Sequence, residues 1–250
     1  MAIIVHQFPA TQILKIEVLN RSRANVPFLN WRVAAKRIGH RNVPREAFTG
    51  AGIYGVCFDD HLIYIGSYLG SGGDKLGRLK AATLGGDVVK ARWWQHFGSI
   101  TGRSHNLSVA ASTMVHLDEE FGQQHPMVVA FRAATPVLSK DAGCLGARER
   151  LVFAARHFSE FAIEHVEPMQ VLSRFSYIYV HFDVLPEGMD AYDLSHRIED
   201  TEARLIESLH PEVNTAGRVV GQLPIRVDSS QVSARIIESL RQGEPIALAF

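Results

Sequence analysis

The sequence predicts an α+β fold, and three features support this prediction. The stretch GIYGVCFDDHLIYIG, residues 52–66, has two short runs of β-favouring side chains separated by a polar turn, which is the pattern of a β-hairpin. The stretch FSYIYVHFDVL, residues 175–185, is a further β-rich run. Amphipathic helical patterns occupy much of the chain around these runs. We therefore expect a sheet with helices packed beside it.

The other elements follow from periodicity and turn residues. Strand patterns lie at 13–19 (ILKIEVL) and 127–135 (MVVAFRAAT), and helix patterns lie at 30–39, 87–100, 107–121, 146–166 and 190–209. A Gly-rich loop, YLGSGGDKLG, comes before the helix at 87–100. The helix at 190–209 is expected to end at His210, because a residue before proline disfavours the helical conformation. The tail at 218–242 predicts a strand or loop and then a short helix.

Length and composition indicate a soluble globular protein. Of its 250 residues, 46% are hydrophobic and 21% are charged. No apolar run approaches the roughly 20 residues of a membrane helix, and MAIIVHQFPATQ lacks the charged region and cleavage site of a secretory signal. We therefore expect a cytoplasmic protein. Cys57 and Cys144 are too few for a four-ligand zinc site, so we expect reduced, structurally ordinary thiols.

Positive charge is concentrated near the N-terminus, although the net charge of the chain is zero. Residues 1–50 carry 8 basic and 2 acidic side chains, whereas residues 151–200 carry 3 basic and 9 acidic ones. A basic segment of this kind can follow a phosphate backbone, and it can equally serve only to keep a surface solvated. The candidate DNA contacts are Arg21, Arg23, Arg32, Lys36, Arg37, Arg41 and Arg45.

The hairpin is expected to place two tyrosines together. If Phe58 pairs with Leu62 across a three-residue loop, Tyr54 lies opposite Gly66 and shares one face with Tyr64, because side chains alternate along a strand. Gly66 would then leave open space over the two phenols. Aromatic neighbours across strands also stabilise ordinary sheets, so the hairpin by itself leaves a structural role open.

The helix at 87–100 carries a second group of polar side chains. Its apolar stripe is Val89, Trp93, Phe97 and Ile100. Arg92 and His96 lie four residues apart along the edge of this stripe. A guanidinium and an imidazole held together repel each other if both are charged, and so suit a site for an anion such as phosphate. An exposed pair without a function has the same spacing.

Glu202 is the third candidate, because helical spacing places it between Ile198 and Ile206 on the apolar stripe of the helix at 190–209. An unpaired carboxylate is costly to bury, so it should be neutral, paired or bound to a metal. A divalent cation and a buried salt bridge both satisfy this condition. Asn214 follows the end of the helix in HPEVN, where asparagine often forms a turn.

Three blocks of residues together resemble the GIY-YIG nuclease superfamily. They are GIY followed by YIG at residues 52–66, the Arg-x-x-x-His helix, and a Glu-x-x-Leu-Ile segment followed by Pro-x-x-Asn. The resemblance covers residues 51–66, 87–100 and 175–215. It implies a small three-stranded antiparallel sheet flanked by helices. In one compact domain, we expect a basic N-terminal arm at 1–50, a core at 51–215 with a long, mainly helical insertion at about 101–174, and an extension at 216–250.

The resemblance also implies catalytic roles. Tyr54 would act as general base or position the attacking water, and Tyr64 would line the same pocket. A phenol with a pKa near 10 is a poor base at neutral pH, so the metal, His96 or a nearby lysine would have to lower the pKa of Tyr54.

Charge stabilisation would come from other residues. Arg92 would neutralise the phosphoryl oxygens, Glu202 would hold a single Mg²⁺ or Mn²⁺, and Asn214 would support the site by hydrogen bonding. Arg78 is the alternative catalytic arginine. We favour Arg92 because His96 follows it by four residues.

The compact size and the basic arm resemble the type II restriction endonucleases of this superfamily. This resemblance implies a prokaryotic enzyme that cuts double-stranded DNA at specific sites and leaves a 5′-phosphate and a 3′-hydroxyl, with a homodimer supplying two active sites. The arm and the insertion would read the bases. One alternative is a catalytically idle DNA-binding module. Another is a nuclease for modified or structured DNA, in which Phe153, Phe158 and Phe161 could line a base pocket, although their spacing favours a helix core.

Overall fold

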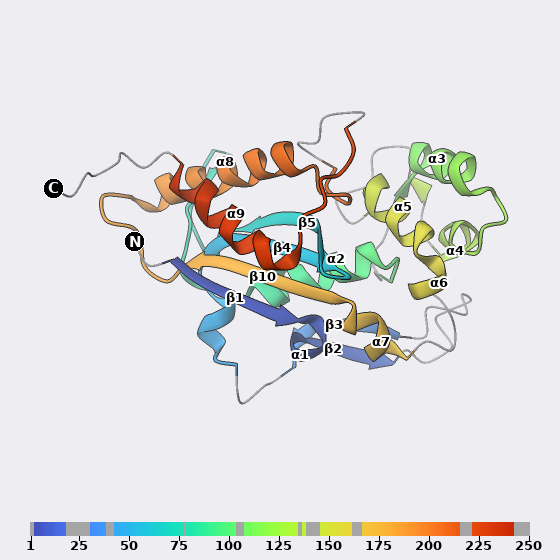
Figure 1. Cartoon of the computed structure of the whole chain (residues 1–250), viewed down its shortest axis with the longest axis horizontal. Helices are drawn as coiled ribbons and strands as arrows, with labels where there is room; N and C mark the ends of the chain where they lie inside the picture. Colours follow the sequence, from blue (N-terminus) through green and yellow to red (C-terminus); the bar gives the residue numbers. More distant parts are fainter. Residues whose placement is uncertain are drawn as a thin grey trace. The chain divides into compact units, whose positions relative to one another are not determined.

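The chain forms two compact units in its computed structural model (Figure 1). Unit 1 contains residues 1–9, 41–88 and 175–250, and unit 2 contains residues 10–40 and 89–174. These boundaries differ from the expected ones at residues 50 and 215. The structure describes residues 3–18, 31–38, 43–77, 79–103, 108–134, 137–138, 146–161, 167–215 and 222–242.

Unit 1 is built on a four-stranded antiparallel sheet. Its strands lie in the order β1 (Ile3–Pro9), β10 (Phe175–Phe182), β4 (Ala51–Phe58) and β5 (His61–Tyr68). The α+β class, the hairpin and the strand at 175–185 are confirmed. The expectation of three strands was wrong, because β1 pairs with β10 along its whole length. Smaller elements of unit 1 are η2 (Arg45–Phe48), β6 (Lys75–Leu76) and β7 (Leu79–Lys80).

Helices α8 (Ala191–Leu209) and α9 (Ser229–Arg241) cover one face of this sheet, and Figure 1 shows them side by side above the strands. Ile53, Ile178 and Val180 point to this face and join the apolar side chains of both helices in one buried cluster. A capping box at Asp190 begins α8, and His210, in the left-handed conformation, ends it before Pro211. The expected helices at 190–209 and in the tail are confirmed.

The opposite face of the sheet is rich in aromatic side chains, and we call it the aromatic face. Strand register and alternation assign its members. Strand β1 contributes His6 and Phe8. The members from the other strands are Tyr177, Tyr179, His181, Tyr54, Tyr64, Gly66 and Tyr68.

The hairpin loop is shorter than expected. Phe58 pairs with His61, so the loop is the two residues Asp59 and Asp60, which both have positive φ, as a type I′ turn requires. The register shifts by one residue after the turn, because Ile63 is an extra residue in β5. The expected pairing of Tyr54 with Gly66 is confirmed.

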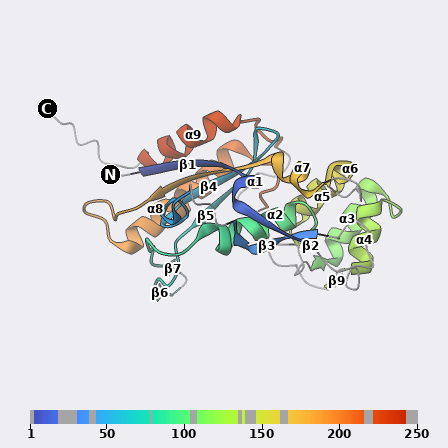
Figure 2. The same cartoon turned by 90° about the horizontal axis from the view of Figure 1, so that it is seen from below.

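Unit 2 begins with the short helix α1 (Ala10–Ile13) and a hairpin of β2 (Leu14–Val18) and β3 (Trp31–Arg37). A π-helical turn, η3 (Val89–Trp93), leads into α2 (Trp94–Ile100). The region expected as an insertion is mainly helical, and Figure 2 shows α3 to α6 gathered together. Its elements are β8 (Val109–Ala110), α3 (Ala111–Phe121), α4 (Pro126–Ala134), β9 (Val137–Leu138), α5 (Arg148–Arg156), α6 (Phe158–Phe161) and α7 (Pro168–Ser173).

Two predictions of secondary structure in unit 2 were wrong. The helix expected at 30–39 is strand β3, which pairs with β2 and is joined to it by an ion pair between Arg32 and Glu17 (3.1 Å). The strand expected at 127–135 is helix α4, in which Met127, Val128 and Phe131 are buried at helical spacing. Cross-strand pairing overrides the helix propensity of alanine and lysine in the first case. In the second case, the proline at position 126 favours a helix start.

None of the helices in the described ranges is both long and apolar enough to cross a membrane.

His181 makes the stability of unit 1 dependent on pH. Its ring stacks on Tyr179 and on His6. Burial lowers the pKa of His181 to about 4, and the positive charge of His6 lowers it further, while the Phe182 backbone and Asp183 oppose the shift. Since the folded pKa lies below the unfolded value near 6.5, stability is fully present above about pH 6.5 and falls as the pH drops toward 4.

We therefore predict that His181→Phe, which keeps a stacking ring, loses less unfolding free energy between pH 7 and 4.5 than the parent. Urea denaturation at several pH values measures the difference. His196→Phe, at an exposed position on α8, is the matched control and should follow the parent. Equal pH dependence in all three proteins would contradict the role of His181.

Candidate functional site

The aromatic face brings Tyr54 and Tyr64 together, as the sequence predicted. Their ring centroids are 6.2 Å apart, with an angle of 39° between the planes. Tyr54, on the central strand β4, is only 1% exposed, whereas Tyr64, on the edge strand β5, is half-buried. Tyr54 pairs with Tyr179 on its other side, and the Tyr179 hydroxyl donates to the Gly50 carbonyl (2.6 Å).

Gly66 allows this arrangement because the two tyrosine rings lie close to its backbone, where a side chain would otherwise stand. A Cβ atom at Gly66 would lie 2.5 Å from Tyr54 Oη and 2.8 Å from Tyr64 Cε1, and atoms do not approach so closely without displacement. The expectation that Gly66 leaves open space was wrong, because the phenol of Tyr54 fills that space. The glycine of the YIG tripeptide is therefore required by the position of the tyrosine of GIY.

Two further polar groups lie at the aromatic face and were missed by sequence reasoning. The backbone N–H of Asp87 donates to Tyr68 Oη (3.1 Å). Burial raises the pKa of Tyr179 well above 10, and nearby Tyr68 and Asp87 raise it further. The alternation of β5 could have identified Tyr68, whereas Asp87 follows a long loop and has no local signal.

Asn214 holds the edge of the sheet in place. Its side-chain amide donates to the Ile65 carbonyl (2.8 Å) and accepts from the Ile65 N–H (2.9 Å). The neighbouring Val213 N–H donates to the Ile63 carbonyl (3.0 Å). The segment after α8 therefore continues the hydrogen bonding of β5, next to Tyr64 and Gly66. The supporting role expected for Asn214 in a catalytic site stays a prediction.

Glu202 occupies a different position on α8 from the one expected. The buried stripe of this helix passes through Ile198, Thr201 and Leu205, and Glu202 lies beside it, half-buried. The argument that Glu202 interrupts the buried face was therefore wrong, since Thr201 takes that place. The apolar side of α8 packs on the face of the sheet opposite to Tyr54.

No cluster of three or more potential metal-ligating His, Cys, Asp or Glu side chains occurs in the part of the chain that the structure describes. Mg²⁺ commonly binds through one or two carboxylates, with water and substrate phosphate completing its shell. A partly exposed Glu202 fits such a site. Metal binding by Glu202 therefore stays a prediction.

Arg92 and His96 belong to unit 2 and have different surroundings. Arg92 lies exposed in the π-helical turn η3, and such turns are frequent at functional sites. His96 is 6% exposed. Burial lowers the pKa of His96 well below 6.5, and the charges of Arg150 and Arg92 lower it further. The imidazole is therefore neutral at neutral pH, and the repulsion expected between two charged side chains does not arise.

The apolar stripe of this helix, Val89, Trp93, Phe97 and Ile100, is confirmed as buried. Arg150 was missed because it lies on α5, far from His96 in the sequence. Phe153 and Phe161 are buried with ring centroids 6.0 Å apart. This supports the helix-core interpretation of these two phenylalanines. Half-buried Phe158 packs against the helical core of unit 2.

The remaining candidates are dispersed. Arg21, Arg23, Arg41, Arg78 and Cys144 lie outside the described residues. Arg32 pairs with Glu17, Lys36 and Arg37 lie on β3, and Arg45 is exposed in η2. Cys57 is a buried free thiol. Burial raises the pKa of Cys57 to about 12, which agrees with an inert structural residue.

Comparison with known proteins found no match for this chain among protein-family models, curated proteins or solved structures. The resemblance to GIY-YIG nucleases therefore depends on the motifs themselves.

We predict that Asn214→Ala lowers the unfolding free energy by about 2–6 kcal/mol, because it leaves two buried backbone groups of Ile65 without partners and each costs about 1–3 kcal/mol. Urea denaturation measures the loss. Thr215→Ala, at the exposed neighbouring position, should change stability by less than about 0.5 kcal/mol. A loss for Asn214→Ala as small as that of the control would show that the amide does not hold β5.

Proposed function

We propose that the protein is a Mg²⁺-dependent, site-specific double-strand DNA endonuclease of the GIY-YIG type. The observation that carries this proposal is the adjacency of Tyr54 and Tyr64 on one face of the hairpin. The phenol of Tyr54 occupies the space that a side chain at position 66 would fill. An aromatic ring over a glycine of an edge strand also occurs in ordinary sheets, so the proposal depends on the two phenol groups lying together. Two phenol groups at one point can hold a water molecule and a phosphate oxygen by hydrogen bonds.

The proposed reaction is hydrolysis of a phosphodiester. A water oxygen bonds to phosphorus while the bond from phosphorus to the 3′ oxygen breaks, and the 3′ oxygen gains a proton. Burial raises the pKa of the neighbouring phenol Tyr179, so this environment favours neutral phenols. Tyr54 is therefore proposed to orient the water through a hydrogen bond, and Tyr64 to contact the phosphate. Bound Mg²⁺ would supply charge stabilisation, and Glu202 would hold it. Because α8 packs on the face of the sheet opposite to Tyr54, this role requires the metal to lie past the edge strand β5.

Charge distribution supports DNA as the substrate. Unit 2 contains 15 basic and 9 acidic side chains, a net charge of +6, whereas unit 1 contains 11 basic and 17 acidic ones, a net charge of −6. A positively charged body attracts the phosphate backbone. The role of Arg92 in neutralising the phosphoryl oxygens is carried into the proposal from the motif resemblance alone. Cutting both strands would require a second active site, which a homodimer provides.

A catalytically idle DNA-binding module is the second candidate. It is favoured by the burial of Tyr54, whose side chain is only 1% exposed and fills the space over Gly66. It would use the basic side chains of unit 2 for binding and the aromatic face only for stability.

We predict that the parent protein cuts a long duplex of known sequence into discrete fragments in Mg²⁺ and not in EDTA. Glu202→Gln should lower the cleavage rate by about 100-fold or more, because it removes the charge that holds the metal. Gel analysis of timed digests measures the rate. Glu199→Gln, at an exposed position on the same helix, should cut like the parent.

Two results would contradict the proposal. Full activity of Glu202→Gln would remove Glu202 from the site. Absence of cleavage by the parent, with DNA binding retained by all three proteins, would instead favour the idle binding module. Cleavage of only modified or branched DNA would keep the chemistry and change the substrate.

A further inference from the structure

Arg103 of unit 2 is a buried cation that forms no ion pair with any acidic side chain in the described ranges. Its side chain is 4% exposed. In the described part of the chain, Nε and Nη1 of this guanidinium are buried without a hydrogen-bond partner. Burial lowers the pKa of Arg103 to about 9, so the group still carries its charge at neutral pH. A buried charge without a partner is costly, and arginine cannot readily avoid the cost by losing its proton.

The position of Arg103 is fixed before any ligand binds. Its guanidinium carbon lies 4.1 Å from the centre of the Trp31 ring, and Trp31 in turn packs against Phe97 of α2. The Arg103 N–H donates to the Gly98 carbonyl (2.6 Å) and so ties the residue to the end of α2. Stacking leaves the N–H edge of the guanidinium clear of the Trp31 ring. Nε and Nη1 are buried, so an anion reaches them only when the side chains that cover them move aside.

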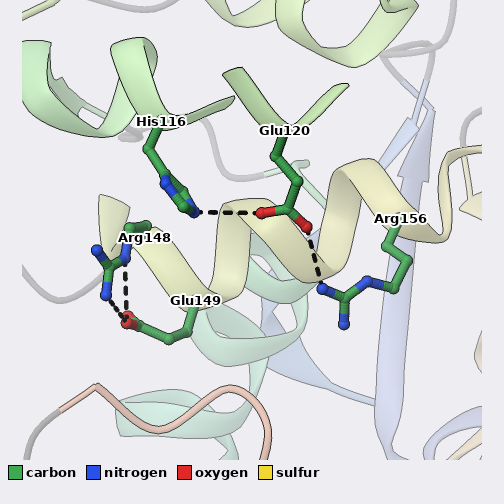
Figure 3. A network of polar contacts seen from close by, with 5 residues as sticks. All are labelled: His116, Glu120, Arg148, Glu149 and Arg156. Atoms are coloured by element: carbon green, nitrogen blue, oxygen red, sulfur yellow. Dashed lines mark hydrogen bonds and ion pairs between the residues drawn. The ribbon is translucent and has the colours of Figure 1, made fainter. Parts of the chain in front are cut away.

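The carboxylates of unit 2 do not fill this role. Figure 3 shows Glu120 bound by both His116 and Arg156, and Glu149 bound by Arg148. The other described ion pairs of unit 2 join Glu17 to Arg32, Asp118 to Arg132, and Glu160 to His157 and Arg174. These acidic side chains already have cationic partners, and the other described carboxylates of unit 2, Glu119 and Glu167, are exposed. No ion pair joins Arg103 to a carboxylate among the described residues.

We propose that Arg103, stacked on Trp31, is a binding site for a phosphate group. Its two partnerless nitrogen atoms supply donors for the phosphate oxygens. The phosphate belongs either to a nucleic-acid backbone or to a free phosphate ion. This proposal does not require the protein to be a nuclease, and it is separate from the roles proposed for Arg92 and Glu202.

The first test measures the thermal midpoint of the full chain during titration with inorganic phosphate, at constant ionic strength adjusted with chloride. At about ten times the dissociation constant, the parent midpoint should rise by roughly 3–6 °C. Arg103→Met should lose this rise. Its midpoint without phosphate should equal or exceed that of the parent, because methionine fills the space without burying a charge. Arg132→Met, which removes an exposed arginine paired with Asp118, should keep the phosphate response.

A phosphate response of equal size in Arg103→Met and the parent would overturn the proposal, and so would a parent that does not respond. If Arg103→Met does not fold, Arg103→Lys replaces it. Lysine keeps a charge but lacks the fork of donors, so the phosphate response should fall by about half or more. An unchanged response in the lysine variant would then overturn the proposal.

The second test identifies the source of the phosphate. Binding of a labelled duplex is measured at several salt concentrations in EDTA, so that cleavage plays no part. If the site takes a backbone phosphate, Arg103→Met should reduce the slope of log affinity against log salt by about 1. An unchanged slope with a lost phosphate response would assign the site to free phosphate. Neither the phosphate-dependent thermal midpoint nor the salt dependence of DNA binding requires cleavage, so both tests can be read even if the nuclease proposal fails.

Discussion

The close approach of the Tyr54 hydroxyl to the backbone of Gly66 is the constraint on which the candidate site depends. Any side chain at position 66 would occupy the place of that phenol. The approach exists only in the register that pairs Tyr54 with Gly66, and the two-residue turn and the extra residue Ile63 produce this register. Asn214 then fixes β5 by bonding both polar groups of Ile65. Turn, bulge and edge contact together hold two phenols at one point.

The sequence predicted the parts of this arrangement that depend on local patterns. The pairing of Tyr54 with Gly66 was predicted correctly from an assumed three-residue loop, because the shorter turn and the extra residue Ile63 compensate for each other. Helical periodicity gave α8 to within one residue and indicated a short helix in the tail, where α9 lies. The predicted loop length of three residues was wrong, because aspartate tolerates positive φ and Asp59 and Asp60 can form a two-residue turn without glycine. Residues 30–39 were assigned to a helix on propensity, whereas pairing with β2 makes them a strand. Propensity is a weak guide where tertiary pairing competes with it.

Other features of the site could not be predicted from spacing along the chain. Arg150 influences His96 from another helix, and Asp87 reaches Tyr68 from the far end of a loop. Glu202 shows the opposite error, because helical spacing alone did not distinguish it from its neighbour Thr201, which takes the buried position. The GIY-YIG resemblance added the chemical interpretation. The geometry alone does not decide this chemical interpretation, since a tyrosine pair over a glycine can be packed for stability or used for catalysis.

A catalytic tyrosine pair is distinguished from a purely structural one by the rate of Mg²⁺-dependent duplex cleavage by Tyr54→Phe. The rate is compared with that of the parent at matched folded fraction. Removing one oxygen keeps the ring and its packing over Gly66. A catalytic phenol predicts a rate lower by about 100-fold, while Tyr177→Phe, on the same face and fully buried, cuts like the parent. Cleavage by Tyr54→Phe at the parental rate would contradict the account, because the hydroxyl would then serve only the fold.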